Sequence, residues 1–415
     1  MDGHIEGLVG EVDAVFDDMV DVRRTLHQHP ELGFEEIEST LLVRERLEGL
    51  GLAERAAVTP TGAAYTLTGG HPGRPVVLRA DIDALPIAEE VSLPFASGVE
   101  GKMHACGHDA HTAVLLGVAQ VLQSRAEDLS GSYTFVFQPA EELLGGARQM
   151  VDAGVLDGLE GGVLLGHHVT SVLPTGLVGM RPGIAMAEVH TFGIVVRGPG
   201  GHGAVPGQLG DVVRAICDAV SRLGAVVEGL DYEHISCVCS AGMVRAGTAP
   251  NVLPDHASLR GTLRTFTPEQ RREALGRLRS LCDRVGSDHG VTVQLELPGN
   301  APAVVNDPST TDTVTRVARA QLGADKVMDM PPVTPSDDVS VFLQQLPGCY
   351  FFVGGALSDG TSGMHHSPTF AIDEEAMRVA ARLMVGAAAA LADTPSGTTR
   401  AGEAPDAWST VADPS

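Results

Sequence analysis

Long hydrophobic runs are missing from this sequence of 415 residues. No apolar stretch approaches the roughly 18–20 residues that a membrane-spanning helix requires. Residues 1–20 are acidic and lack the basic segment, followed by an apolar stretch, that marks a secretory signal peptide. The sequence therefore predicts a soluble, cytoplasmic protein that makes no use of a membrane.

Basic residues are also scarce. Lys and Arg number 28 against 53 Asp and Glu, so the formal net charge is −25. A surface of this sign repels nucleic acid and anionic lipid. Neither is expected as a partner, and the charge alone does not indicate the substrate.

The six cysteines do not show the spacing of a secreted disulfide framework. We expect free thiols. Cys237 and Cys239 are two residues apart in a strand-like run and so face one side of it. This arrangement favours packing in a core, because free Cys buries readily; a metal-binding pair is the alternative.

Helix and strand patterns alternate over the first part of the chain. Strand-like runs at 76–83, 132–139 and 162–169 are separated by helical periodicity, as at 111–125. This order predicts an α/β layered domain with buried strands. In such sheets the chemistry gathers in loops beyond the strand ends.

The pattern changes after Pro182. Strand and helix signals then follow in the order β-α-β-β-α-β over residues 190–297, which is the split βαβ arrangement of ferredoxin-like folds. Thr267, with Pro268 behind it and Gln270 three residues on, predicts the start of the second helix.

The chain is long enough for two domains. We expect an α/β fold with a discontinuous main domain, an inserted ferredoxin-like domain, and a disordered tail that lacks apolar periodicity. The expected limits are 1–184 and 301–393 for the first domain, 185–300 for the insertion and 394–415 for the tail.

The densest chemical cluster is the run GKMHACGHDAH at 101–111. Cys106 and His108 are two residues apart, and Gly107 permits a tight turn between them. This spacing allows a thiolate and an imidazole to reach one metal ion. Two alternatives stay open here: Cys106 as a nucleophile with His108 as its base, or a His-rich loop without a ligand.

Further acidic residues and imidazoles follow other predicted strands. Glu141 and Glu142 come after the strand run at 132–139, and neighbouring residues at a strand end point in different directions. One carboxylate can then bind a metal while the other faces a bound water. Additional candidates are His167 and His168, His365 and His366, and Asp81 and Asp83, of which an Asp could support a ligand from behind. Together these patterns predict a metal site.

At this point the chain resembles the M20 metallopeptidase family, in its branch of hippurate, N-acyl-amino-acid and indoleacetyl-amino-acid amidohydrolases. The resemblance runs from about Arg23 to Leu391, and its most specific motifs are the Cys-Gly-His-Asp and Pro-Ala-Glu-Glu runs. The matching segments are RRTLHQHPELGFEE (23–36), LRADIDALPI (78–87), GKMHACGHDAHTA (101–113), FQPAEE (137–142), GHHV (166–169), GPGGHGAVP (198–206), TAPNVLPDHASLRGTLRTF (248–266) and MHHSPTF (364–370).

The resemblance implies a role for each matching residue. It makes Glu141 the general base and Asp83 the acid that orients the site, and it places Asp81 where other branches have a His ligand. It implies two divalent ions bridged by the Cys sulfur; Zn, Mn, Co and Ni all suit such ligands. The implied metal ligands are Cys106, His108, Glu142, His168 (not His167) and His366 (not His365).

The inserted unit resembles the family's lid and dimerisation domain, which implies a homodimer or higher homo-oligomer. His202 matches a lid His that helps to hold the scissile carbonyl, often across the dimer, and Asn251 and Arg264 match polar lid positions suited to a substrate carboxylate or carbonyl. Two residues depart from the family pattern. Gly207 stands where a His is usual, and Asp337 where a Glu is usual, and both bear on substrate preference.

The resemblance implies hydrolysis of the amide bond of a small N-acyl amino acid to a carboxylic acid and a free amino acid. Three alternatives remain: a dipeptidase or aminoacylase with the same chemistry, a hydrolase that uses Cys106 as nucleophile, and a metal-binding protein without activity. The presence of Glu141 argues against the last, because a protein that only binds metal needs no base at that position.

Overall fold

The computed structural model describes residues 3–55, 59–205 and 210–394. The expected tail at 394–415 lies, apart from Thr394, outside the described residues. The chain divides into two compact units. The first comprises Met1–Ala185, Val305–Met330 and Asp337–Ser415, and the second comprises Met186–Val304 and Pro331–Ser336.

The segment Pro331–Ser336 corrects the expected limits, which assigned it to the first domain. It belongs to the second unit because Val333 bridges to Met186 and its carbonyl accepts the N–H of Ala187 at 2.9 Å. A contact of this kind joins residues far apart in sequence, and periodicity along the chain carries no sign of it.

The first unit is built on a mixed sheet whose eight described strands run in the order β1-β2-β4-β3-β5-β18-β6-β17. Its central strands β4, β3, β5 and β18 are parallel neighbours, and β1 and β2 continue the sheet as antiparallel strands. The strands are β1 (Ala53–Glu54), β2 (Ala63–Thr68), β3 (His71–Asp81), β4 (Ser130–Gln138), β5 (Val163–Pro174), β6 (Val178–Met180), β17 (Val327–Asp329) and β18 (Gly348–Ala356).

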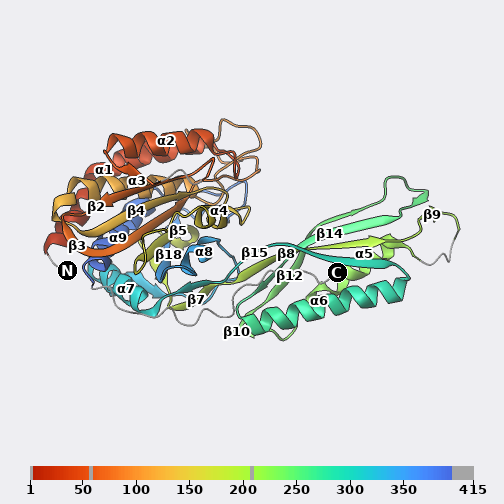
Figure 1. Cartoon of the computed structure of the whole chain (residues 1–415). Helices are drawn as coiled ribbons and strands as arrows, with labels where there is room; N and C mark the ends of the chain where they lie inside the picture. Colours follow the sequence, from red (N-terminus) through yellow and green to blue (C-terminus); the bar gives the residue numbers. More distant parts are fainter. Residues whose placement is uncertain (1–2, 56–58, 206–209, 395–415) are drawn as a thin grey trace. The chain divides into compact units, whose positions relative to one another are not determined.

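Helices pack on this sheet, and the predicted α/β class is confirmed. In the first unit α3 and α9 pack on β3, and α1 packs on α3 and α9 (Figure 1). The described helices of this unit are α1 (Gly3–Gln28), α2 (Ile37–Gly49), α3 (His108–Ser124), α4 (Gly146–Asp152), α7 (Pro308–Leu322), α8 (Val339–Leu343) and α9 (Glu375–Ala392).

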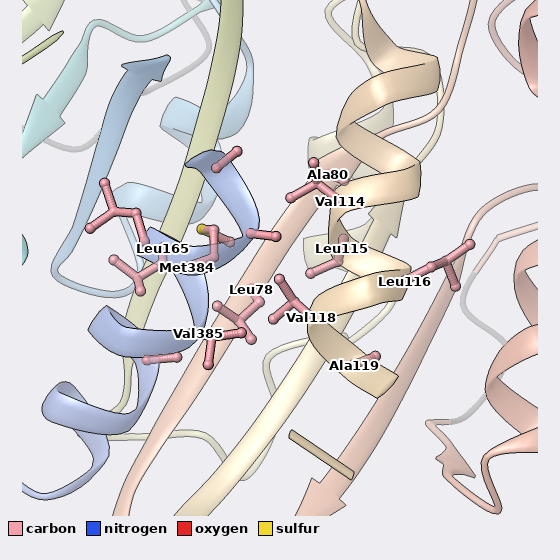
Figure 2. Close-up of a cluster of buried hydrophobic side chains, with 14 of the residues drawn as sticks. Leu78, Ala80, Val114, Leu115, Leu116, Val118, Ala119, Leu165, Met384 and Val385 are labelled. Atoms are coloured by element: carbon pink, nitrogen blue, oxygen red, sulfur yellow. The ribbon is translucent and has the colours of Figure 1, made fainter. Parts of the chain in front are cut away.

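The core of the first unit lies between the sheet and these helices. Figure 2 shows Leu78 of β3 between Val118 of α3 and Val385 of α9, and all three side chains are fully buried. Val114 and Val118 are four residues apart and so lie on one face of α3. Fully burying an aliphatic side chain of this size stabilises the fold by about 1.5–3 kcal/mol. This packing fixes α3, and with it the loop that precedes α3, against the end of β3.

The second unit contains a four-stranded antiparallel sheet in the order β12-β14-β8-β15, within the described residues. With its two helices the chain order is β-α-β-β-α-β, as predicted. The elements are β8 (Glu188–Arg197), α5 (Val212–Arg222), β12 (Val238–Ala246), β14 (His256–Thr265), α6 (Pro268–His289) and β15 (Thr292–Ala301). Short strands of the same unit are β9 (Gly201–His202), β10 (Asp231–Tyr232), β11 (Ile235–Ser236) and β13 (Val252–Leu253), and β7 (Gly183–Met186) and β16 (Val304–Asn306) lie at its border with the first unit.

The start of α6 follows the predicted sequence signal. The Thr267 side chain accepts the N–H of Gln270, and the Gln270 side chain accepts the N–H of Thr267. These two bonds satisfy N–H groups that a helix start otherwise leaves unpaired.

No helix among the described residues is long and apolar enough to cross a membrane.

A buried charge cluster ties α1 to the start of α3. The His27 ring lies 2.8 Å from Asp109 and 3.3 Å from Glu89, and Arg23 donates to Asp109 at 3.2 Å. Burial opposes the charge on the ring, but the neighbouring carboxylate of Asp109 outweighs it and raises the pKa of His27 to about 9. His27 is therefore an imidazolium at neutral pH, and it holds Asp109 beside the first residue of α3.

We expect His27→Gln to lower the free energy of unfolding by about 3 kcal/mol near neutral pH, because it removes one partner of a buried ion pair. The pKa is raised on folding, so the stabilisation is complete below pH 6.5 and is lost as the pH rises through about 9. Denaturant unfolding of both proteins at several pH values measures the difference. His71→Gln, at an exposed imidazole, is the control. A difference that is the same below pH 6.5 and above pH 9 would contradict the ion-pair account.

Candidate metal centre

The five predicted ligands lie in overlapping groups in the first unit. Cys106, His108 and His168 offer ligand atoms within 4.8 Å of one another. Cys106, Glu142 and His366 form a second such group. The Cys106 thiol belongs to both groups, so one sulfur lies within reach of both sets of ligands.

The loop before α3 brings Cys106 and His108 together. Gly107 between them has a φ of 89°, a left-handed conformation that favours glycine. A Cβ atom at this position would lie 2.6 Å from the Val169 side chain. Helix α3 begins at His108, three residues earlier than the periodicity predicts, so this His is held by the first turn of a buried helix.

Asp83 orients two members of the site. Its Oδ1 accepts from Nδ1 of His108 at 3.1 Å, and its Oδ2 accepts the backbone N–H of Glu142 at 3.0 Å. In the neutral form of the ring, which a metal ligand requires, Nδ1 donates to Asp83 and the other ring nitrogen of His108 carries the lone pair. That Nε2 atom is buried and has no hydrogen-bond partner among the described residues. A carboxylate behind a His whose second nitrogen is free is the usual support of a metal ligand.

His168 is oriented in a similar way by its own strand. Its Nδ1 donates to the Val169 carbonyl at 2.5 Å, and its Nε2 lies 3.5 Å from Sγ of Cys106. The expected strand end at residue 169 is wrong, because β5 runs on to Pro174 through its pairing with β18. His168 therefore projects from within a strand rather than from its end.

His366 and Glu142 complete the group. Nε2 of His366 lies 3.2 Å from Oε1 of Glu142. His366 has a φ of 61°, a strained conformation for a residue with a Cβ, and such strain is found where a side chain must be aimed. A divalent transition metal fits this site, because a thiol, imidazoles and a carboxylate surround the buried Nε2 of His108, which has no hydrogen-bond partner in the described chain.

Glu141 lies beside these ligands on the buried side. It forms a group with His108 and Glu142, and another with Asp337 and Asp338. Burial, and then the nearby carboxylates, raise the pKa of Glu141 well above the usual range. The two glutamates follow Ala140, whose φ of 49° turns the chain sharply after β4. A carboxyl with a raised pKa next to a ligand cluster is typical of a general base.

Residues 77–390 match Peptidase family M20/M25/M40. The chain belongs to this family. It is 37% identical over 382 residues to an N-acetylcysteine deacetylase of Bacillus subtilis, covering 91% of this chain and 97% of the relative. It is 36% identical over 369 residues to the IAA-amino acid hydrolase ILR1-like 2 of Arabidopsis thaliana, covering 88% and 82%.

Solved structures agree with the assignment. A dinuclear metal-binding peptidase of the M20 family from Bacillus subtilis superposes with a TM-score of 0.76 at 34% identity, covering 92% of this chain and 99% of that one. As a member of the M20 family, the chain is a metal-dependent hydrolase that acts on amide bonds.

The thiol of Cys106 has the wrong environment for an independent nucleophile. Burial, and then the charge of Glu142, raise the pKa of the Cys106 thiol. The thiolate is the nucleophilic form, and nucleophilic cysteines have a lowered pKa. Among the open interpretations, the surroundings of Cys106 favour a metal ligand of the M20 site.

The structure adds His365 and His111 to the surroundings of the ligands. Nδ1 of His365 lies 3.7 Å from Sγ of Cys106, and its Nε2 lies 3.3 Å from Oγ1 of Thr170. His111, the last residue of the motif at 101–111, contacts Asp81 and the backbone of Val169. Both residues lie in motifs that the sequence displays, but their contacts could not be predicted, because each contact joins segments far apart in the chain.

His167 makes no comparable contact. Both of its ring nitrogens are buried without a hydrogen-bond partner in the described part of the chain, and its ring meets that of His111 edge to face at 5.1 Å and lies 6.1 Å from that of Phe351. Burial lowers the pKa of His167 well below the usual range, so the ring is neutral. It packs in the core like an aromatic side chain.

His202 and Asn251 lie close together in the second unit. His202 is in β9, which pairs with Val252 of β13, and the Asn251 carbonyl accepts the N–H of Gly203 at 3.0 Å. Nδ1 of His202 accepts the N–H of Ala204 at 3.1 Å, which leaves Nε2 as the donor.

Arg264 lies in β14 of the four-stranded sheet, whereas β9 and β13 form a separate two-stranded pair. The β9–β13 pair adjoins the start of β14, where the Asp255 carbonyl accepts the N–H of Gly198. Arg264 is eight residues beyond His256, the first residue of β14, which is about 26 Å along the strand at about 3.3 Å per residue. Its guanidinium donates to the Thr334 carbonyl and to Oγ of Ser336, each at 3.1 Å. Within one chain the structure therefore does not bring Arg264 together with His202 and Asn251.

The two departures from the family pattern have different outcomes. Asp337 is buried and bonds to Arg79 at 3.0 Å and to the Tyr350 hydroxyl at 2.5 Å. Asp337, which is shorter than the usual Glu, thus belongs to a buried hydrogen-bond network with Arg79 and Tyr350, next to Glu141. Gly207 lies outside the described residues.

We expect Asp83→Asn to lower the affinity for divalent metal by about 10–100-fold, the usual effect of removing such support. Asn offers one acceptor and one donor, so it cannot accept from both His108 and the N–H of Glu142. Competition with a chromophoric chelator measures the affinity. Asp329→Asn, at an exposed position of β17, is the control. Equal affinities of wild type and Asp83→Asn would show that Asp83 does not orient the ligands.

Proposed function

We propose that this chain hydrolyses N-acyl amino acids, releasing a carboxylic acid and a free amino acid, with two divalent ions held by Cys106, His108, Glu142, His168 and His366. The observation that carries the proposal is the pair of three-residue ligand groups that share the Cys106 thiol. The names of two relatives, a deacetylase of N-acetylcysteine and a hydrolase of IAA-amino acids, support this substrate class.

The metal supplies one part of the chemistry. Bound divalent ions polarise a carbonyl and lower the pKa of a bound water from about 16 toward about 7. Zn, Mn, Co and Ni all suit the ligand set. Asp83 holds the orientation of His108 and of the Glu142 backbone, so the ligands are in place before substrate arrives.

Glu141 handles the proton. As a carboxylate it accepts the proton of the attacking water, and as a carboxylic acid it delivers that proton to the leaving nitrogen. Its burial and the raised pKa support both steps. A carboxylate that is costly to bury is a stronger base than one in water, and its protonated form is stable enough to persist until the amine departs.

The second unit supplies polar groups for the substrate. We infer that residues 185–300 act as a lid and dimerisation domain, in which Nε2–H of His202 stabilises the oxyanion and Asn251 and Arg264 bind carboxylate or carbonyl oxygens. The β9–β13 pair that carries His202 adjoins the start of β14, whereas Arg264 lies near the far end of β14, and this placement supports a homodimer. Both can serve one small substrate only if they come from different subunits.

The two glutamates can be separated by substitution. Glu141→Gln keeps the size of the side chain but cannot take a proton, so we expect full metal content and a loss of roughly 10²–10⁴ in kcat. Glu142→Ala removes a ligand, so we expect a loss of both metal and activity. Elemental analysis and steady-state kinetics measure the two effects. Near-normal kcat in metal-replete Glu141→Gln would remove Glu141 from the mechanism.

The proposed function is tested by chelation and a substrate screen. Exhaustive chelation should abolish hydrolysis, and divalent ion should restore it. The screen compares N-acetyl, benzoyl, succinyl and indoleacetyl amino acids with dipeptides, so preference for dipeptides would select the peptidase alternative. Full activity in protein verified to be free of metal would instead select the Cys106 hydrolase, and metal binding without any hydrolysis would select the non-enzymatic protein.

A further inference from the structure

Near the proposed metal centre, strand β5 extends beyond the end of its pairing with β3. The pairing of β3 with β5 ends at Arg79 and Gly166, whereas β5 continues to Pro174. Val169 lies in the stretch beyond the last β3 pair, and its N–H donates to Nε2 of His111 at 2.9 Å. A buried N–H without a partner is costly. His111, from the first turn of α3, provides the acceptor at this position.

The other nitrogen of His111 is held as well. Nδ1 lies 2.6 Å from Oδ1 of Asp81, and the second oxygen of Asp81 accepts from Arg79 at 2.8 Å. A carboxylate can only accept, so Nδ1 carries the proton and Nε2 has the lone pair that Val169 requires. Asp81, His108 and His111 have ligand atoms within 4.8 Å of one another. Because both ring nitrogens of His111 are occupied, it does not serve as a metal ligand.

The backbone of Val169 connects His111 to His168. The carbonyl of Val169 accepts from Nδ1 of His168, and this bond leaves Nε2 of His168 directed at Sγ of Cys106. The two imidazole rings also meet edge to face, with centroids 4.6 Å apart. A continuous chain of contacts thus runs from Asp81 through His111 and Val169 to His168.

We propose that His111 is a positioning residue that, oriented by Asp81, fixes the Val169 backbone and thereby aims His168 at the metal. The inference rests on the proposed function, since it takes His168 as a ligand. Loss of this support should weaken metal binding by about 10–100-fold, as for other groups behind a metal-binding His.

Three substitutions separate the contacts of His111. His111→Phe keeps a flat ring but offers no acceptor. His111→Asn has a polar group near the place of Nδ1, so it can bond to Asp81 but is too short for Val169. His111→Gln reaches the place of Nε2 and can accept from Val169. We expect His111→Phe and His111→Asn to lower the affinity for divalent metal, and we expect His111→Gln to keep most of the wild-type affinity.

The experiment measures Co²⁺ affinity by competition with a chelator, and records the visible absorption spectrum of each Co²⁺ protein. The spectrum reports ligand geometry, which a loss of stability alone would not change. His167→Phe is the matched control, because it replaces a neighbouring buried imidazole that has no hydrogen-bond partner in the described chain. It should bind Co²⁺ with wild-type affinity and spectrum.

Each outcome bears on the proposal. If His111→Phe has wild-type affinity and spectrum, the inference is overturned, even where the melting temperature falls. If His111→Phe does not fold, Asn and Gln decide, and equal affinities of these two overturn it. A fall in affinity of similar size for His167→Phe also overturns it. If the wild-type protein binds neither Co²⁺ nor any other divalent ion, the proposed function is overturned together with this inference.

Discussion

The guanidinium of Arg79 is the group on which the buried face of the site depends. It lies fully buried on β3 and bonds to Gln138, Asp81 and Asp337. Several carboxylates lie side by side at the ends of β3 and β4, and burying them without a counter-charge would be prohibitive. Burial opposes the charge of Arg79, but the carboxylates of Asp337 and Asp81 outweigh it and raise the pKa of Arg79. A cation here permits acidic residues to be concentrated beneath the ligands.

The acidic residues near Arg79 do not all bond to its guanidinium, and their pKa values differ as a result. Burial opposes the charge of Asp81, but His108 and then Arg79 and His111 outweigh it and hold the pKa of Asp81 well below its usual range. Asp81 is hydrogen-bonded to Arg79 and to His111. Glu141 has no bond to the guanidinium among those found in the described chain, and its pKa is raised by burial and by Asp337. One network therefore contains a permanent carboxylate that orients a ring and a second carboxyl that is able to exchange a proton.

Much of the fold could be predicted from local patterns. The helical periodicity at 111–125 indicated α3, whose apolar face forms part of the core around Leu78, and the Thr267–Gln270 signal marked the start of α6. The cysteine, histidine and glutamate motifs indicated which side chains would come together. What local patterns could not predict depends on pairing between distant segments. The continuation of β5 to Pro174 requires β18, and the roles of His111 and His365 follow from distances that no spacing encodes.

The proposed ligands differ greatly in their access to solvent. His108 is 1% exposed and Cys106 8%, whereas the side chain of His366 is 51% exposed, on a loop with a left-handed turn. A multidentate complex dissociates one ligand at a time, and the ligand with the fewest restraints detaches first. Metal exchange should therefore be a kinetic process gated by the His366 loop, with an off-rate set by local opening of that loop rather than by unfolding of the sheet. Occupancy in a cell would then depend on how long this loop stays closed as well as on equilibrium affinity.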